Sequence, residues 1–556
     1  MQRYTLFSIF VLSLILMSSL TILLIMKVNA SNCMNTFTLA YNFASSNYHK
    51  THKFVQKCLP NENKVFSHKY SWVFAVYMAA DNNYESIHAY YESNLQKMRK
   101  IGSTRDILIL VLVDVPQDVW QDVPQRYDGI MIVYHCRFAY IERFDEVNAG
   151  NPATLRYFMK MIFNYAANHY ALIFYGYAGG WPGTCVDENP NDYLRLNEIK
   201  QALSGYHVDL IGFCGSPMAN IETAYELRSC ADILVASEEA CLPDWPFDRI
   251  LQRLTTKPSM SPKELARTIV DKCSNYEIEN KNNRFVYSAI DLTKVNSIAF
   301  WINKLATTLR LNLITISSLT FNGYLYRHRS IKHAFYVRSN VFKIETYLYP
   351  SQGCNFDLSL WDSRNRRTGG WMQNEPPKRN IPNSQYFQLR DGREIIIVDP
   401  VVSAGTWHVG CYSLFGSGKY TIIVRLWYDK YEHLINIILG YVEYFSCSDS
   451  DDLIRHGGEF RCLDIYNFAF WICICTRTRE RIHYYARRLM NVLSNAIIHE
   501  RHGNGHPNAR GLAVYFPRDP TTFDRNYIKF KLDFVENTQW DEFLLAYYYF
   551  LSILLS

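Results

Sequence analysis

The chain has 556 residues, of which 48% are hydrophobic and 20% are charged, a composition typical of a globular protein with more than one domain. Its formal net charge is +6 at neutral pH, and the lysines and arginines are scattered rather than clustered. This mild, dispersed charge argues against a nucleic-acid-binding protein, so we expect no nucleic-acid partner.

The N-terminus carries an apolar segment. Residues Thr5–Met26 form an uncharged run that is long enough to span a bilayer. Val28 and Ala30 then place small residues where signal peptidase cleaves. We therefore predict that residues 1–30 are a signal peptide or, if uncleaved, a signal-anchor that holds the chain to a membrane. Either alternative directs the chain into the secretory pathway, as a secreted protein or as a single-pass membrane protein with its bulk in the lumen or outside the cell.

The cysteine content agrees with that compartment. The chain contains 14 cysteines, an even number that is compatible with disulfides in an oxidising environment. Cys354 and Cys411 are candidate partners, as are Cys447 and Cys462, while the connectivity stays open. The cysteines and histidines do not show the spacing of a metal site, so we expect no metal ion and no cofactor.

Residues 31–70 are polar and irregular and are predicted to be a lead-in or linker. Beyond them, apolar runs and helical periodicity alternate along the chain. The predicted elements are strands over 71–78, 106–113, 130–134 and 171–177, and helices over 84–101, 155–166 and 194–203.

The next stretch combines a buried strand with a turn. Val208–Phe213 is a short apolar run, as expected of a strand covered on both faces of a parallel sheet. Apolar residues recur at helical spacing from Met218 onwards, and Pro217 is tolerated in a first helical turn. The turn Cys214–Ser216 therefore lies at the carboxyl edge of the sheet, where open α/β sheets place their chemistry.

The remaining pattern predicts the domain organisation. Ala231–Glu239 is predicted to be the final strand, and the alternation of strands and helices specifies a parallel sheet with helices on both faces. Over 330–427 the pattern changes to short alternating runs separated by turn residues, which is typical of an antiparallel β-sandwich. We predict an α/β domain in two parts, 71–325 and 428–556, with the sandwich inserted between them.

Three segments resemble the clostripain family of cysteine peptidases. Residues 208–227 resemble the nucleophile segment, D-L-I-G-F-D-A-C-L-M-G-M-I-E-V-A-Y-E-L, and Ala171–Trp181 resemble the catalytic-His segment, L-I-L-W-N-H-G-G-G-W. Ala231–Glu239 are similar to A-D-Y-L-V-G-S-E-E. The resemblance covers residues 71–548 outside the insert, which itself is similar to a pre-peptidase C-terminal domain. It implies a caspase-like fold.

Both catalytic positions of the family are replaced. The family's His falls on Tyr177, and its nucleophilic Cys falls on Ser216. The family's Asp that is associated with binding a basic side chain falls on Cys214. The other expected substrate-cleft residues are Gly179, Gly180, Trp181, Ser237, Glu238 and Glu239. The two adjacent glutamates are expected at a solvated rim, because neighbouring strand residues face opposite ways.

These replacements remove the chemistry of a cysteine peptidase, which needs a thiolate, an imidazole base and oxyanion donors. A phenol with a pKa of ~10 is a poor base at neutral pH, so Tyr177 does not activate the hydroxyl of Ser216. His169 lies at the opposite edge of the sheet. Cys214 is expected to be a small buried residue or to form a disulfide, for example with Cys185.

We interpret the chain as a pseudopeptidase that binds a peptide or protein, either in the old substrate cleft or on the sandwich. Two alternatives stay open. One is an active endopeptidase with a relocated nucleophile, Cys214 or Ser216, and a His from elsewhere. The other is a structural surface protein whose cleft is closed by the ring of Tyr177.

Overall fold

The structure is a computed structural model that describes residues 68–82, 85–116, 128–215, 217–241, 243–429, 432–446, 461–517 and 520–555. The chain divides into two units, Met1–Ser67 and His68–Ser556, and all described residues belong to the second. The apolar run Thr5–Met26 and the turn residue Ser216 lie outside the described residues. Within the described ranges, no helix is both long and apolar enough to cross a membrane.

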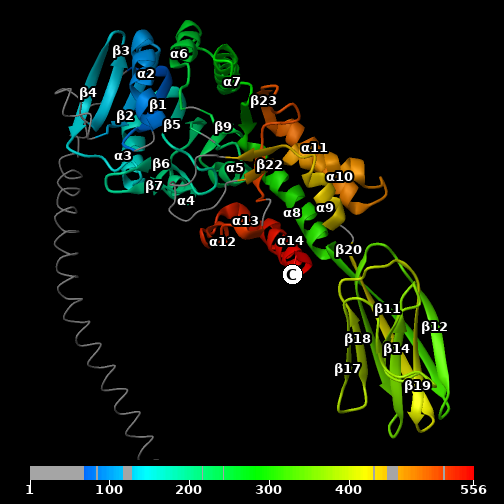
Figure 1. Cartoon of the computed structure of the whole chain (residues 1–556). Coiled ribbons are helices and arrows are strands. Elements are labelled where there is room, and N and C mark those ends of the chain that lie inside the picture. Colours follow the sequence, from blue (N-terminus) through cyan, green and yellow to red (C-terminus); the bar gives the residue numbers. More distant parts are fainter. Residues whose placement is uncertain are drawn as a thin grey trace, which may run out of the picture. The chain divides into compact units, whose positions relative to one another are not determined.

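A nine-stranded sheet forms the centre of the α/β part (Figure 1). Its order is β23 (Ile497–His502), β10 (Val286–Asp291), β9 (Ala231–Ser237), β8 (Val208–Cys214), β5 (Ala167–Tyr175), β1 (Tyr70–Ala79), β2 (Ile107–Asp114), β3 (Asp128–Tyr134) and β4 (Arg137–Phe144). The strands from β9 to β2 are parallel, and the outer four pair antiparallel. The predicted α/β class with a mostly parallel sheet is confirmed. The expectation that Ala231–Glu239 is the final strand is wrong, because β10 and β23 extend the sheet.

Helices cover both faces of this sheet (Figure 1). On one face, α2 (Glu85–Ile101), α6 (Phe247–Thr256) and α7 (Pro262–Glu279) share a buried core with alternate residues of β1, such as Phe74 and Val76. On the other face lie α3 (Pro152–Phe163) and α4 (Leu196–Ala202). The ring of Tyr77 there lies 6.0 Å from that of Phe158 in α3.

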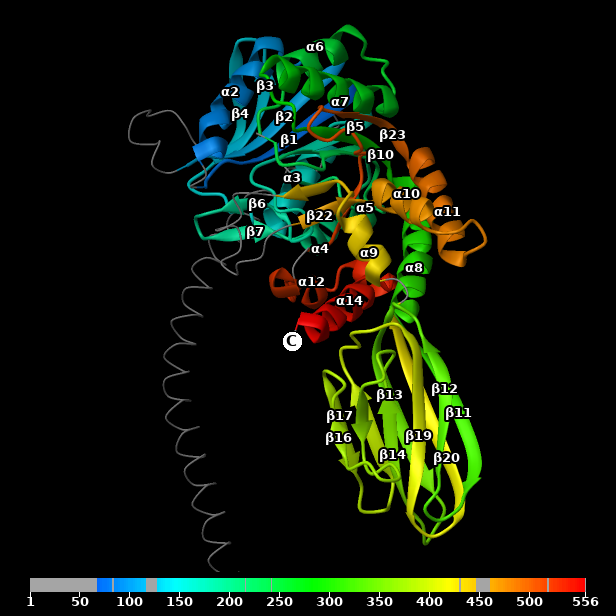
Figure 2. The ribbon, with the colours of Figure 1, turned by 45° about the vertical axis from the view of Figure 1, so that its right-hand side comes forward.

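The chain leaves the α/β part after η2 (Leu292–Lys294) and α8 (Val295–Asn312) and forms two antiparallel sheets of five strands each (Figure 2). One has the order β11 (Ile314–Leu325), β20 (Gly418–Asp429), β13 (Val341–Pro350), β18 (Glu394–Val398) and β17 (Ser384–Gln388). The other has the order β12 (Ser330–Val337), β19 (Gly405–Phe415), β14 (Asn355–Trp361), β15 (Arg367–Gly369) and β16 (Lys378–Arg379). Buried residues of both sheets form one core around Trp407.

The expected disulfide between Cys354 and Cys411 is not formed, and both cysteines are free. Cys411 lies opposite Leu358 in the pairing of β14 with β19. Cys354 precedes that position by four residues, about 13 Å along an extended strand, which is beyond the reach of a disulfide. Cys447 of the second expected pair lies outside the described residues.

The C-terminal part returns to the α/β sheet. It contains a small sheet of β21 (Tyr444–Ser446), β22 (Arg461–Asp464) and β24 (Ala513–Tyr515). Its helices are α9 (Glu432–Leu439), α10 (Ile465–Cys475), α11 (Arg481–Ala496), η3 (Pro520–Thr522), α12 (Asn526–Lys529), α13 (Asp533–Asn537) and α14 (Trp540–Leu555). Ala513 of β24 forms a β-bridge to Asn220, directly after the candidate turn.

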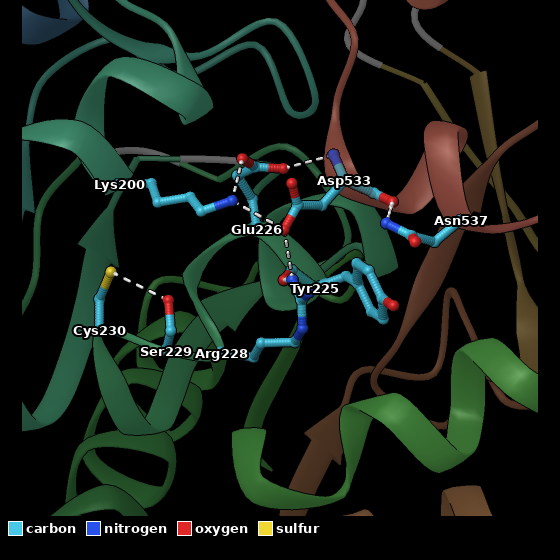
Figure 3. A network of polar contacts seen from close by, with 8 residues as sticks. All are labelled: Lys200, Tyr225, Glu226, Arg228, Ser229, Cys230, Asp533 and Asn537. Carbon is cyan, nitrogen blue, oxygen red and sulfur yellow. Dashed lines mark hydrogen bonds and ion pairs between the residues drawn. The ribbon is translucent and has the colours of Figure 1, made fainter. Parts of the chain in front are cut away.

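A polar network attaches the C-terminal part to the helices near the candidate turn (Figure 3). The carboxylate of Asp533 in α13 accepts hydrogen bonds from Lys200 of α4 at 2.7 Å and from Arg228 at 2.8 Å. The backbone N–H of Asp533 donates to Glu226 of α5 (Ile221–Leu227) at 2.7 Å. The last helices are therefore fixed against the segment that follows the turn.

Candidate functional site

The two segments that carry Tyr177 and Ser216 leave the sheet side by side. Tyr175 and Cys214 are paired at the carboxyl ends of β5 and β8, and Tyr177 and Ser216 each follow two residues later in the sequence. A Cβ atom on Gly215 would lie 2.2 Å from the carbonyl oxygen of Gly176, so the two backbones touch at a position that only glycine fits. The structure thus brings the two motif segments together as the sequence predicted, while Ser216 itself lies outside the described residues.

Tyr177 is held by its backbone. The N–H of Cys185 donates to the carbonyl oxygen of Tyr177 at 2.9 Å, and the hydroxyl of Thr184 donates to the same oxygen at 3.2 Å. Both donors belong to β6 (Thr184–Asp187), which pairs with β7 (Asp192–Leu194). The side chain of Tyr177 is half-buried and packs against the core on the α6–α7 face.

The glycines and the tryptophan of this loop are buried rather than lining an open surface. Gly179 donates its N–H to Gly183 at 3.0 Å, and Gly180 adopts a φ of +78°, which favours glycine. Trp181 is buried, and its ring contacts three aromatic rings of the C-terminal part. These partners are Tyr515, Tyr527 and Phe530. Trp181 therefore anchors the loop in a core.

Cys214 is a buried, free thiol. It packs in the core that contains Trp245, whereas Cys185 lies on the other side of the strand ends, beside Asp187 and Tyr77. The expectation of a small buried residue is confirmed, and the expected disulfide to Cys185 is not formed. Burial raises the pKa of the Cys214 thiol well above its usual range, although the backbone N–H of Trp245 hydrogen-bonds to it. Buried thiols of raised pKa are unreactive.

The helix after the turn begins later than the sequence suggested. Met218 and Ala219 precede the helix and donate their N–H groups to the carbonyl oxygen of Ser237, at 3.0 and 2.9 Å. The side chain of Asn220 then accepts from the N–H of Thr223 at 2.8 Å and caps α5. The prediction that Pro217 lies in the first helical turn is therefore wrong, because Asn220 is the N-cap and the helix begins after it.

The acidic pair at the end of β9 is buried, which corrects the expectation of a solvated rim. Ser237 is also buried and donates its hydroxyl to the carbonyl oxygen of Glu239 at 2.8 Å. Glu238 accepts the N–H of Gly511 at 2.8 Å and shares a hydrogen bond with the buried carboxyl of Asp464. Burial and this second carboxyl raise the pKa of Glu238 well above its usual range, and burial raises that of Asp464 to about 7. A shared proton stabilises such a pair.

Glu239 faces an imidazole that the sequence analysis did not single out. Nε2 of His506 lies 2.7 Å from the carboxylate of Glu239, and Nδ1 lies 3.3 Å from that of Glu443. Burial alone would lower the pKa of His506, but the two carboxylates outweigh it and raise the pKa. No local pattern could have indicated this residue, because its partners come from segments 267 and 63 positions earlier.

His169 and His135 lie elsewhere in the structure. His169 pairs with Trp72 near the start of β5, and its Nδ1 is hydrogen-bonded to a carboxylate oxygen of Asp209 at 2.8 Å. It is six residues from Tyr175 along the strand, about 20 Å, at the opposite edge as expected. His135 lies in the turn between β3 and β4, with Nδ1 3.0 Å from the carbonyl oxygen of Lys100.

The family model of the clostripain family, peptidase family C11, matches residues 76–547. The chain belongs to the clostripain family. Its sequence shows no match among curated proteins.

Solved clostripain-family structures show distant similarity. A secreted C11 cysteine protease from Bacteroides thetaiotaomicron, in complex with an irreversible peptide inhibitor, has a TM-score of 0.47 and 13% identity, covering 85% of this chain and 99% of its own. An inactive zymogen C11 protease from Parabacteroides distasonis has a TM-score of 0.44 and 13% identity, with coverages of 85% and 99%. Both TM-scores are below 0.5 and both identities are 13%, so the assignment to the clostripain family rests on the match to the family model.

Proposed function

We propose that this clostripain-family chain is a pseudopeptidase that binds a peptide or protein without cleaving it. The observation that carries the proposal is the pair of carboxylates that flank His506, beside the loop after β9. Both of its ring nitrogens face carboxylates, and these two carboxylates raise the pKa of the imidazole against the effect of burial. With a carboxylate at each ring nitrogen, neither nitrogen is left to pair with a nucleophile, and the family's own base position is Tyr177.

The buried thiol supports the same proposal. A relocated nucleophile at Cys214 would need a thiolate that substrate can reach. Cys214 is instead enclosed in the core, and its pKa is raised by burial. The basic-side-chain subsite of the family is also lost, because a neutral thiol replaces the carboxylate at this position.

We place the binding surface on the sandwich rather than in the old cleft. Of the expected cleft residues that the structure describes, Tyr177 is partly exposed and the others are buried. The sandwich, by contrast, exposes Tyr324 at 54%, Tyr326 at 67% and Phe415 at 59%. The two tyrosine rings lie 5.1 Å apart, and the guanidinium of Arg327 lies 5.3 Å above the ring of Phe415. Tyrosine and arginine are enriched among residues that dominate protein interfaces.

We further propose that the protein works in the secretory pathway, either secreted or anchored with its bulk in the lumen or outside the cell. The support is the apolar run Thr5–Met26 of the sequence.

The activity is tested with purified chain and fluorogenic peptides that contain arginine or lysine. We expect no hydrolysis above the rate of buffer alone, and no labelling of Cys214 by thiol-directed active-site probes. Hydrolysis that disappears in Ser216→Ala or Cys214→Ala would instead establish an active peptidase and overturn the proposal. The wild type and both variants are compared at equal folded concentration.

The converse experiment restores the family's dyad with Tyr177→His and Ser216→Cys together. Because Gly176 and Gly215 keep the two segments in contact, we expect the double variant to hydrolyse peptides that neither single variant cleaves. A folded double variant without hydrolysis would show that more than the dyad has been lost. Binding is tested separately, with a displayed peptide library and Tyr324→Ala with Tyr326→Ala. Enrichment should be lost in that variant and retained in a control, Tyr484→Ala, at a tyrosine that is 52% exposed on α11.

A further inference from the structure

The outer face of helix α10 exposes apolar side chains. α10 contains no charged residue, and its inner face is buried, with the ring of Phe468 6.2 Å from that of Trp540. Phe470 and Ile474 lie one turn apart on the opposite side of the helix and are 38% and 59% exposed. Cys475, which ends the helix, is exposed as well. Packing inside the protein explains only the inner face, so the clustered apolar residues on the outer face indicate an interaction surface.

Aromatic rings extend this surface. Tyr441, which follows α9 and is 60% exposed, stacks on Trp471 of α10 with the ring centroids 4.8 Å apart. The ring of Trp471 lies 5.7 Å from that of Phe470. Tryptophan and tyrosine combine an apolar ring with one polar group, and they are enriched where a protein meets the boundary between lipid and water.

A cluster of arginines follows α10 directly in the sequence. Residues 477–488 contain five arginines and one glutamate, so this short segment carries a formal charge of +4, compared with +6 for the whole chain. The overall composition conceals this concentration, because the charges elsewhere nearly cancel. The carboxylate of Glu480 accepts the backbone N–H of Arg477 at 3.2 Å. All five arginines are exposed, and they are Arg477, Arg479, Arg481, Arg487 and Arg488.

The apolar and basic residues meet at one end of a helical hairpin. α10 and α11 lie side by side and are joined by residues 476–480 (Figure 2). The thiol of Cys473 contacts the carbonyl oxygen of His483 at 3.7 Å, so the last turn of α10 packs against the first turn of α11. Ile474 and Cys475 therefore lie beside the arginines of the connecting segment.

We propose that this end of the hairpin, residues 470–481, docks on the surface of an anionic lipid bilayer. Phe470 and Ile474 would enter the boundary between headgroups and acyl chains, while the nearby arginines would contact lipid phosphates. α10 has 11 residues, which is too short to cross a bilayer, so the contact is peripheral. This inference does not depend on whether the chain cleaves peptides, and it gives the hairpin a partner different from that of the sandwich.

The combination of charge and apolar surface favours a bilayer over a soluble acidic partner. An anionic bilayer offers phosphates for the arginines and, at the same time, an apolar layer for Phe470 and Ile474. A soluble acidic polymer offers only the negative charge. Near an anionic bilayer each arginine contributes about fivefold in affinity, so three of them contribute roughly 100-fold. Because salt screens these charges, docking should weaken as the ionic strength rises.

The test uses the whole purified chain and vesicles of phosphatidylcholine that contain about 30% phosphatidylglycerol. Hydrogen exchange followed by mass spectrometry reports on each segment separately, so insertion of the apolar run Thr5–Met26 does not imitate docking by the hairpin. We expect exchange over residues 474–481 to slow at least ~5-fold with these vesicles, and to stay unchanged at the turn of Cys136, which is also exposed. About 0.5 M NaCl should remove most of the protection, because it shortens the Debye length to ~4 Å.

A triple variant tests the arginines. Arg477→Gln, Arg479→Gln and Arg481→Gln together should raise the vesicle concentration for half-maximal protection at least ~30-fold. The matched control changes the net charge equally by replacing three exposed arginines of the sandwich, and it should keep the wild-type response. Its substitutions are Arg338→Gln, Arg364→Gln and Arg390→Gln.

A single variant tests the apolar contact. Ile474→Ser should weaken the response at least ~3-fold, whereas Ile278→Ser, at an isoleucine that is 53% exposed on α7, should not. Equal protection by vesicles of pure phosphatidylcholine would overturn the proposal, as would protection by soluble polyglutamate but not by the anionic vesicles. An equal loss in the two triple variants would also overturn it, because the response would then follow net charge alone.

Discussion

The backbone N–H of Cys185 donates a hydrogen bond of 2.9 Å to the carbonyl oxygen of Tyr177. This bond involves main-chain atoms of both residues, so it does not depend on which side chain occupies position 177. The course of this loop therefore tolerates different side chains at position 177. The same holds for Gly215 and Gly176, whose contact is also between backbones.

Trp181 should be a major contributor to the stability of this loop. Its buried ring contacts Tyr515, Tyr527 and Phe530. Truncation of a buried tryptophan leaves a large cavity, so we expect Trp181→Ala to lower the free energy of unfolding by about 3–5 kcal/mol. Urea denaturation followed by circular dichroism measures the change. The control is Trp371→Ala, at a tryptophan that is 42% exposed and should cost much less. Equal effects of the two variants would contradict a buried anchor.

The thiol of Cys214 should resist alkylation in the native protein. It is enclosed in the core and its pKa is raised, whereas Cys136 and Cys475 are exposed. After brief treatment with iodoacetamide at pH 7.5, peptide mass spectrometry should find the two exposed cysteines modified and Cys214 unmodified. Denaturation before labelling should make all three equally reactive. Rapid labelling of Cys214 in the folded chain would favour the relocated nucleophile.

Glu222 should make the stability depend on pH. Its carboxylate accepts the hydroxyl of Tyr527 at 2.7 Å and the N–H of Tyr515 at 3.0 Å, both on the same oxygen. Burial outweighs these bonds and raises the pKa of Glu222 from 4.5 to about 7. The protonated form is thus favoured in the folded state, and its contribution is complete below pH 4.5 and is lost as the pH rises through 7.

The neutral variant Glu222→Gln keeps an acceptor for both donors but does not ionise. Relative to wild type, its free energy of unfolding should increase by about 3 kcal/mol between pH 4.5 and pH 8, in line with the shift in pKa. Chemical denaturation at several pH values measures this difference. A constant difference over that range would show that Glu222 is not the titrating group.

Asp533 should make the stability depend on pH in the direction opposite to that of Glu222. Burial alone would raise its pKa, but Lys200 and Arg228 outweigh it and lower the pKa (Figure 3). The stability from this carboxylate is therefore present above its ordinary pKa and is lost as the pH falls through its lowered value. At pH 7, Asp533→Asn should lower the free energy of unfolding by about 1–3 kcal/mol, because two charge-assisted hydrogen bonds are weakened.

The control for Asp533→Asn is a substitution in an exposed ion pair of the sandwich, between Glu375 and Lys378. Glu375 lies 2.8 Å from Lys378 and is largely solvated, so Glu375→Gln should leave the denaturation midpoint nearly unchanged. Equal losses in the two variants would contradict a special contribution of the network in Figure 3.

The strands of the parallel sheet could be predicted because each carries its own signal. Val208–Cys214 and Ala231–Ser237 are short apolar runs bounded by turns, and their observed limits lie within two residues of the predicted ones. The start of α5 was misplaced, because apolar spacing from Met218 resembled helix while the cap at Asn220 decided the boundary. Local periodicity does not reveal which side chain will satisfy the first N–H groups of a helix.

The sequence predicted those residues of the candidate site that lie within a contiguous motif, and it missed those that come from distant segments. Tyr177 and the turn at Cys214 each lie in a recognisable segment, and the structure brings those segments together. His506 and Asp464 could not be found in this way, because they reach the glutamates after β9 from the C-terminal part of the chain. Burial of those glutamates follows from these distant partners, which no local pattern contains.

The pairing of β10 with β23 also has a consequence for biosynthesis. Val286 lies opposite His502, so this edge of the sheet stays open while more than 200 intervening residues emerge from the ribosome. The sandwich has its own core and can mature during that interval. An open strand edge invites pairing with other nascent chains. A chain that is truncated anywhere before β23 would therefore keep this edge open, even when its sandwich is complete.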